Sequence, residues 1–373
     1  MSCNAFRLAA LASAFFFCAL GRAASEPQNP PAARAPNPSF REIWAYLLRG
    51  DEGQLTGTEP ITDLCYFSVS LTKEGRITEA VARPAVNSTK GAAPRRHLVV
   101  TELSNEALMH FSLDPEYGVR PQLIDDIRRV SEGFDGVQID FESVSRDDAE
   151  YFFDFLKGLR NSLPAGRILS VAVPARTRLI ADAYDYSRIA AVADKLIVMA
   201  YDEHWSTSAP GPVASLPWCG KVVDYARGVI DRGKIVMGVP LYGRAWQDKR
   251  LSRALRFKNV QDIVAEKKSE TNYSSELGAW FEYSENVVVT VFYDDERSLL
   301  EKLNLYKARD VESVSFWRIG LGADTFWNIF EPPGATIVPS RKGAFATPPF
   351  AAPAADPTMA PSREASASVA PPP

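Results

Sequence analysis

Residues 134–142 read FDGVQIDFE and place two carboxylates on alternate positions of an otherwise apolar run. Side chains two residues apart in a β-strand share one face, so Gln138, Asp140 and Glu142 point to one side and the apolar residues between them to the other. Burying a row of ionisable groups costs free energy, so such a row is expected where the groups have a function. We interpret Asp140 and Glu142 as acid–base groups. A structural polar network is the alternative, although that role would not require an acid to stand last on the strand.

Composition limits the classes of protein to which the chain can belong. The 373 residues have a hydrophobic content of 46% and a formal net charge of −4. This content is ample for a sizeable core, and the length fits one large domain or two ordinary ones. Because there is no basic excess, nothing in the charge predicts binding to nucleic acid or to an anionic membrane.

Both ends of the chain differ in composition from its middle. Residues 1–24 contain Arg7, an apolar stretch and small residues, the layout of a signal peptide; a retained anchor is the alternative. We therefore expect an exported protein, secreted or held in the periplasm or cell envelope, with no membrane span after signal removal. We interpret 25–38 as a Pro-rich linker and 332–373 as a disordered Pro/Ala-rich tail, because such composition buries too little apolar surface to order a chain.

The segment between them, 39–331, alternates apolar runs with amphipathic ones. Short, continuous apolar runs are typical of parallel strands covered by helices. Eight such runs of this total length predict a (β/α)8 TIM barrel, rather than an open doubly wound sheet, which would usually carry a Gly-rich nucleotide loop. The runs begin at Glu42, Asp63, His97, Phe134, Arg167, Lys195, Lys234 and Ser313.

Helices are expected between several of these runs, and one connection is too long to be simple. The helical patterns cover 122–130, 147–163 with Ser145 as a plausible N-cap, 221–231 and 295–306. Residues 247–294 are expected to form an insertion between strands 7 and 8, with a short helix at 260–267 and a hairpin around 284–286. We expect this insertion to wall one side of a cleft.

The cysteines and histidines do not form a recognisable metal-binding pattern. Of the cysteines outside the signal segment, Cys65 lies in a predicted strand and Cys219 in a loop-like segment, and two free thiols are preferred over a disulfide. His97, His110 and His204 are scattered along the chain. We predict no metal and no cofactor.

Several segments, in the same order along the chain, resemble glycoside hydrolase family 18, the chitinase-like barrels. FDGVQIDFE is similar to the family's Asp-Gly-x-x-Asp-x-Glu strand. The segment 198–205, VMAYDEHW, is similar to its Met-x-Tyr-Asp strand, and 238–246, GVPLYGRAW, to its seventh strand. The segment 291–320, VFYDDERSLLEKLNLYKARDVESVSFWRIG, resembles the family's closing segment, in which the eighth strand ends on a tryptophan, here Trp317. The likeness is nearest to the bacterial branch of spore-germination and cell-wall hydrolases.

The resemblance implies a role for each matching residue. Glu142 is expected as the general acid, Asp140 as the group that holds the substrate's acetamido N–H, and Tyr201 as the donor to its carbonyl. Substrate-binding roles are expected for Gln138, Asp202, Tyr242, Arg244 and Trp317, with Trp317 as the sugar platform at the barrel floor; Arg244 could equally form a loop salt bridge. Each of four other tryptophans is either a further sugar platform or a packing residue: Trp205, Trp218, Trp246 and Trp280.

Strand geometry restricts the mechanism that such a site can use. A retaining glycosidase usually places its acid and its nucleophile about 5 to 5.5 Å apart on opposite sides of the sugar. Asp140 stands on the same side as Glu142 and cannot attack from the other. The 2-acetamido group of the substrate can attack instead, because a carbonyl held beside the reacting carbon has a very high effective molarity.

Two functions follow from these expectations. The first is an exported, retaining hydrolase of β-1,4-linked N-acetylhexosamine polymers of chitin or peptidoglycan type, acting as a monomer on an N-acetylated polysaccharide or oligosaccharide. The second is a sugar-binding or wall-associated protein with weak or no turnover. Glu142 favours the enzyme, and Gln138 favours the binder, because the family most often has aspartate at that position. With glutamine there, carboxyl–carboxyl coupling at this position is lost.

Overall fold

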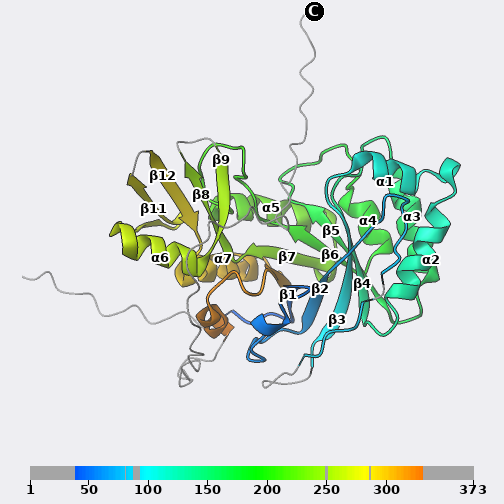
Figure 1. The fold of residues 1–373 in the computed structure, drawn as a ribbon, viewed down its shortest axis with the longest axis horizontal. Helices are drawn as coiled ribbons and strands as arrows, with labels where there is room; N and C mark the ends of the chain where they lie inside the picture. The colour runs from blue at the N-terminus through cyan, green and yellow to red at the C-terminus, as the bar shows by residue number, and fades with distance from the viewer. Residues whose placement is uncertain (1–37, 80, 87–92, 248–250, 285–286, 331–373) are drawn as a thin grey trace, which may run out of the picture. The chain divides into compact units, whose positions relative to one another are not determined.

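The computed structural model describes residues 38–79, 81–86, 93–247, 251–284 and 287–330 (Figure 1). The predicted signal peptide and the tail lie outside these residues, as does all of the linker except Pro38. Within the described ranges, no helix combines the length and the apolar character that a bilayer span requires.

Eight parallel strands close into a barrel, which confirms the predicted TIM-barrel fold (Figure 1). Each predicted apolar run corresponds to one strand. Around the barrel each strand pairs with its neighbours in chain order, and β13 closes the ring between β7 and β1. The strands are β1 (Glu42–Leu48), β2 (Asp63–Ser70), β3 (Arg95–Glu102), β4 (Gly136–Phe141), β5 (Ile168–Pro174), β6 (Lys195–Met199), β7 (Ile235–Pro240) and β13 (Ser313–Trp317).

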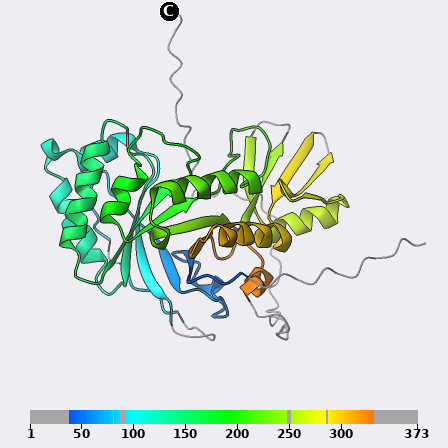
Figure 2. The same cartoon turned by 180° about the vertical axis from the view of Figure 1, so that it is seen from behind.

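Helices cover the outside of the barrel. In the view from behind, α5 and α7 run side by side, and Arg309 after α7 pairs with Asp224 of α5 at 2.6 Å (Figure 2). The covering helices are α1 (Glu106–Leu113), α2 (Arg120–Val130), α3 (Ala149–Ser162), α4 (Tyr186–Val192), α5 (Leu216–Val229) and α7 (Glu296–Ala308). Short 3-10 turns are η1 (Glu52–Gln54), η2 (Pro115–Tyr117), η3 (Arg232–Lys234) and η4 (Asp324–Phe330).

Two local predictions about these helices are wrong. Asp148, not Ser145, is the N-cap of α3, and the Ser145 hydroxyl instead donates to the Asp148 carboxylate at 2.9 Å. Cys219 lies in a helix and not in a loop, because Ser215 caps α5 and Pro217 occupies its first turn, where a proline needs no hydrogen-bond partner for its nitrogen. Cys65 and Cys219 are both buried and free, as predicted.

The insertion between β7 and β13 is a separate antiparallel sheet in the strand order β10-β11-β12-β8-β9. It starts earlier than expected, at Tyr242 rather than Gln247, because β7 ends at Pro240. The helix expected at 260–267 is longer, and the expected hairpin is formed by β11 and β12. Its elements are β8 (Tyr242–Gln247), β9 (Leu251–Arg256), α6 (Phe257–Lys267), β10 (Asn272–Ser274), β11 (Gly278–Ser284) and β12 (Val288–Tyr293).

The alternation predicted for the carboxylate strand is confirmed. Val137, Ile139 and Phe141 belong to the core between the barrel and the helices. Phe141 stacks on Phe155 of α3 with ring centroids 5.5 Å apart. The intervening side chains of β4 therefore face the barrel interior, alongside the aromatic cluster that contains Tyr46.

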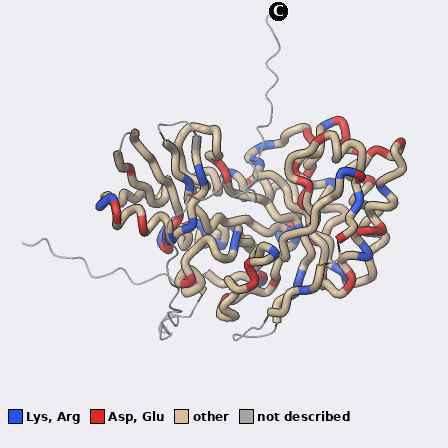
Figure 3. The backbone as a smooth tube through the Cα atoms, viewed as in Figure 1, with Lys and Arg blue, Asp and Glu red and all other residues tan. Residues whose placement is uncertain are grey.

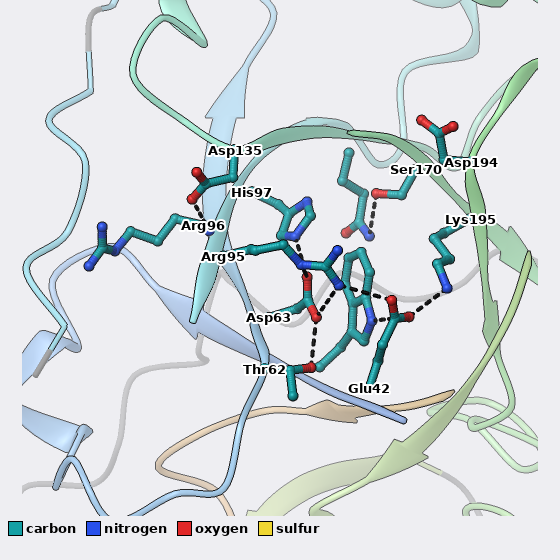
Figure 4. Close-up of polar contacts among 12 residues, drawn as sticks. Glu42, Thr62, Asp63, Arg95, Arg96, His97, Asp135, Ser170, Asp194 and Lys195 are labelled. Atoms are coloured by element: carbon teal, nitrogen blue, oxygen red, sulfur yellow. Dashed lines mark hydrogen bonds and ion pairs between the residues drawn. The ribbon is translucent and has the colours of Figure 1, made fainter. Parts of the chain in front are cut away.

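A polar network closes the N-terminal end of the barrel (Figure 4). Asp63 accepts from His97 at 2.7 Å and from Arg95 at 2.8 Å. Glu42 pairs with Lys195 at 2.5 Å and with Arg95 at 2.9 Å. Burial raises the pKa of Glu42, but hydrogen bonds from Lys195 and Arg95 outweigh it and lower this pKa to about 2. In TIM barrels, groups at this end contribute stability rather than catalysis.

Charges of both signs are interspersed along the barrel and the insertion (Figure 3). Many of them pair across neighbouring elements, such as Arg188 of α4 with Glu150 of α3 at 2.6 Å. Exposed pairs of this kind contribute little individually. The stability of the fold therefore depends mainly on the apolar core.

Gly136 makes room for the N-terminal network, and this yields a stability prediction. A methyl group at position 136 would lie 2.2 Å from His97 Nδ1 and 2.9 Å from the Ile168 carbonyl oxygen. We expect Gly136→Ala to lower the free energy of unfolding by about 1 to 3 kcal/mol, because the surrounding atoms cannot all move away. Thermal and urea denaturation would measure the change.

The matched control is Gly228→Ala in α5, where an added Cβ meets nothing within 4 Å. That substitution is expected to leave stability unchanged or raise it by up to about 1 kcal/mol, because alanine favours helix over glycine. Equal unfolding midpoints for the two variants would contradict the packing role of Gly136.

Candidate active site

The two carboxylates of β4 lie at the C-terminal end of the barrel. Asp140 is the last inward-facing residue of β4, 4% exposed and opposite Thr101 of β3. Glu142 follows the strand directly, is half-buried, and its backbone N–H donates to the Glu102 carbonyl at 2.8 Å. This is the end at which TIM barrels build their active sites.

Burial and mutual repulsion keep protons on this pair. Burial raises the pKa of Asp140 to about 7. Burial also raises the pKa of Glu142 well above its ordinary value, with further contributions from the negative charges of Asp140 and Asp202. Carboxyls that interact in this way titrate as a pair, and the raised pKa values favour a protonated Glu142 beside Asp140. The pair can thus supply an acid and a neighbouring carboxylate at the same time.

Tyr201 lies two residues past the end of β6, and its placement depends on a glycine. Its backbone N–H donates to the Met199 carbonyl at 2.8 Å. A Cβ at Gly238 of β7 would lie 2.9 Å from Tyr201 Cε1, so only glycine leaves room for the ring. Burial, Asp140 and Glu142 raise the pKa of the Tyr201 phenol well above its ordinary value. The phenol is therefore a permanent hydrogen-bond donor.

Asp202 is held by the insertion sheet. Its Oδ1 accepts from Tyr242 Oη at 2.6 Å and from Arg244 Nη2 at 2.8 Å. Its backbone lies in the left-handed region with φ 56°, which aspartate tolerates better than most residues. Tyr242 and Arg244 were expected on the seventh barrel strand, but they lie on β8, the first strand of the insertion. Arg244 is thus in a buried strand and forms an ion pair with a neighbour of the carboxylates, not a loop salt bridge.

Trp317 ends β13 and is half-buried against two aromatic residues of the barrel interior. Its indole centroid lies 5.1 Å from the Tyr46 ring and 4.9 Å from the Phe67 ring. Its carbonyl accepts from the backbone N–H of Leu241 at 2.7 Å. The indole is thus fixed on one side by packing.

Gln138 is fully buried and only partly satisfied. Its Nε2 donates to Ser170 Oγ of β5 at 3.4 Å. Its Oε1 and Asp140 Oδ1 have no hydrogen-bond partner among the described residues. Buried acceptors without donors are rare, so the site has unused capacity to accept hydrogen bonds at Asp140.

Sequence reasoning missed two groups beside the carboxylates. Tyr46 of β1 lies next to Gln138, and burial, Cys65, Tyr201 and Asp140 raise the pKa of its phenol. Thr101 of β3 shares hydrogen bonds with Ser70 at 2.9 Å and Ser68 at 3.2 Å. Tyr46 occupies an inward position of the run EIWAYLL, and that alternation was the signal that could have identified it.

The four tryptophans for which a platform or a packing role was open divide into one packing residue and three with partial exposure. Trp246 is fully buried, and its Nε1 donates to the Ser208 carbonyl at 3.1 Å, so it is a packing residue. Trp280 stacks on Phe292 with centroids 6.3 Å apart. Trp205, Trp218 and Trp280 are half-buried.

The histidines are engaged in separate local contacts. His97 contacts Asp63, His110 contacts Asp148 at 2.8 Å, and His204 contacts the Pro212 carbonyl at 2.9 Å. Over the described part of the chain, no three His, Cys, Asp or Glu side chains are grouped so as to hold a metal ion.

Comparisons with known proteins agree with this geometry. Residues 120–322 match the model of glycosyl hydrolases family 18. A putative sporulation-specific glycosylase, YdhD of Bacillus subtilis, is 34% identical over 201 residues, which are 51% of this chain and 48% of that protein. A cortical fragment-lytic enzyme of Bacillus anthracis is 26% identical over 292 residues, 72% of this chain and 67% of that protein. The chain thus spans about half of the first relative.

A solved structure supports the fold. The Bacillus cereus spore cortex-lytic enzyme SleL has a TM-score of 0.68 and 24% identity, over 78% of this chain and 74% of that one. The barrel, the carboxylate strand at its C-terminal end and the family match over more than half of the chain lead to one conclusion. This chain belongs to glycosyl hydrolases family 18, and the proteins that it resembles include members of the spore-germination and cell-wall branch.

Proposed function

We propose that the protein is an exported, retaining glycoside hydrolase that cleaves β-1,4-linked N-acetylhexosamine polymers, with the substrate acetamido group as nucleophile. The observation that carries this proposal is the Asp140–Glu142 pair at the C-terminal end of β4, in which Asp140 is buried, Glu142 is half-buried and both carboxyls have raised pKa values. An acid is thereby available, but neither carboxyl can attack from the opposite side of the sugar.

Each residue then has a role in the reaction. Glu142 protonates the glycosidic oxygen, and the same group later takes a proton from water. The Tyr201 phenol donates to the acetamido carbonyl and orients it toward the anomeric carbon. Asp140 Oδ1, buried and without a partner among the described residues, accepts the acetamido N–H and stabilises the positive charge that develops on the ring so formed.

The residues around the Asp140–Glu142 pair bind the sugar. A pyranose face stacks on the half-buried Trp317 at the barrel floor. The cluster of Asp202, Tyr242 and Arg244 contacts the neighbouring subsite, fixed by its own hydrogen bonds at 2.6 and 2.8 Å. Because two of these three residues belong to the insertion sheet, the insertion forms one wall of the binding site.

The relatives' names support a cell-envelope substrate. One is a cortical fragment-lytic enzyme and another a putative sporulation-specific glycosylase. We therefore propose a chitin- or peptidoglycan-type polymer, and an exported monomer that meets it in the cell envelope or outside the cell.

The second candidate function is a sugar-binding protein on the same barrel with weak or no turnover. The observation in its favour is Gln138, fully buried at a position where the family most often has aspartate. Glutamine cannot share a proton with Asp140, so the Asp140–Glu142 pair retains its protons only through burial and the charges of Asp140 and Asp202.

The substrate's acetamido group provides the first test. The protein should hydrolyse N-acetylated oligosaccharides and should turn over their de-N-acetylated counterparts at least about 1000-fold more slowly, because the nucleophile is missing. Product release measured by chromatography would give both rates. Glu142→Gln should reduce turnover of the acetylated substrate by at least about 100-fold while binding persists.

Equal turnover of both substrates would exclude the acetamido mechanism. Binding of acetylated oligomers without turnover by the wild-type protein would establish the sugar-binding function instead.

Gln138→Asp tests how the pair keeps its protons. In the wild type, Asp140 must lose its proton to act, so the acidic limb of the kcat/KM profile follows its raised pKa. A carboxyl introduced at position 138 shares one proton with Asp140. This favours the form in which the new pair, position 138 and Asp140, carries a single negative charge. The acidic limb should therefore move to lower pH by about one unit, as measured from pH–rate profiles.

Gln138→Asn is the control, since it keeps a neutral amide at the same position. Its acidic limb should stay within about 0.3 units of the wild type. An identical profile for the Asp and Asn variants would refute the coupling.

A further inference from the structure

Tyr184 is a buried tyrosine outside the set of residues that would contact a substrate. It lies between β5 and α4 and is 8% exposed. Its ring packs edge-on against Phe152 of α3 at 5.9 Å between centroids. Its own backbone N–H donates to Asp182 Oδ1 at 2.9 Å, and Asp182 pairs with Arg176. The side chain is therefore held rigidly beside the end of β4.

The Tyr184 phenol bridges the backbone on both sides of Glu142. Its hydroxyl donates to the Phe141 carbonyl at 2.7 Å and accepts from the Val144 N–H at 3.2 Å. The Phe141 carbonyl belongs to the peptide that precedes Glu142, and the Val144 N–H lies two residues after it. One hydroxyl thus closes the turn that contains Glu142.

A third hydrogen bond holds this turn to β3, where the Glu102 carbonyl accepts from the Glu142 N–H at 2.8 Å. Together the three bonds fix the backbone from which the Glu142 side chain extends. Without the phenol, a buried carbonyl and a buried N–H would both lose their partner, and the turn would relax to find new ones.

We propose that Tyr184 is a positioning residue for Glu142, fixing the backbone of its turn so that the carboxyl faces the glycosidic oxygen. This inference rests on the proposed function of Glu142 as the acid. The side chain of Tyr184 takes no part in bond making. Its contribution is to keep the acid within the narrow range of distances that proton transfer requires.

The electrostatics around the phenol agree with this placement. Burial raises the pKa of the Tyr184 hydroxyl, and the charges of Glu142, Asp182 and Asp140 raise it further. The hydrogen bond from the Val144 N–H lowers this pKa, but the net shift is upward. The hydroxyl is therefore always protonated and always able to donate to the Phe141 carbonyl.

The test compares Tyr184→Phe with Tyr186→Phe. Tyr186 is also buried, and its hydroxyl also donates to a backbone carbonyl, but this is the carbonyl of Pro174 at the end of β5, at 2.6 Å, and not one of the Glu142 turn. Tyr184→Phe should lower kcat by at least about tenfold with KM changed less than about twofold, because the acid is displaced while the sugar contacts remain. Tyr186→Phe should leave kcat within about twofold.

The pH profile separates positioning from a general loss of structure. A Glu142 carboxyl freed from its buried place meets more water, so its raised pKa should fall. The basic limb of kcat/KM should move to lower pH by about half a unit or more in Tyr184→Phe and should stay in place in Tyr186→Phe. Equal effects of the two variants on kcat and on the basic limb would overturn the proposal.

A direct titration makes the result independent of turnover. Carbon-13 NMR of glutamate-labelled protein, with Glu142→Gln to identify the resonance, should give a lower titration midpoint for Glu142 in Tyr184→Phe than in the wild type or Tyr186→Phe. An unchanged midpoint would reject the positioning role. If the wild-type protein fails to hydrolyse acetylated substrates, the proposed function fails, and this titration still decides the role of Tyr184.

Discussion

The function proposed for this barrel depends on two neighbouring carboxyls, that of Asp140 on β4 and that of Glu142 directly after this strand. Asp140 and Glu142 cannot both ionise easily, because burial disfavours each charge and the charge of Asp140 disfavours that of Glu142. In the proposed function, that constraint provides the acid. The position of both carboxyls on one side of the sugar also excludes the usual arrangement of acid and nucleophile across it, so the proposed reaction uses the substrate's acetamido group instead.

The rest of the fold serves to hold that pair in place. Helix α3 covers the outer face of β4 through Phe152 and Phe155, and the network of Glu42, Asp63 and Arg95 closes the far end of the barrel. Two side chains of the insertion sheet, Tyr242 and Arg244, donate hydrogen bonds to Asp202. Each of these supports comes from a different part of the chain.

The sequence predicts what is local and periodic. Alternation along FDGVQIDFE indicated the inward face of β4, and eight apolar runs indicated the barrel strands. Neither pattern could reveal a contact between segments far apart in the sequence, such as the hydrogen bonds from Tyr184 to the turn that contains Glu142. The start of the insertion was missed because Tyr242 and Arg244 continue an apolar run without a break, although they pair with another sheet.

The stereochemistry of the first product tests the central claim most directly. Proton NMR recorded during hydrolysis of a β-linked N-acetylated oligosaccharide reports the anomer released before mutarotation. Attack by the acetamido group followed by water on the opposite face gives two inversions, so the acetamido mechanism predicts the β-anomer first. Initial release of the α-anomer would mean a single displacement by water, and the same-face pair of carboxylates would then not have the role proposed for it.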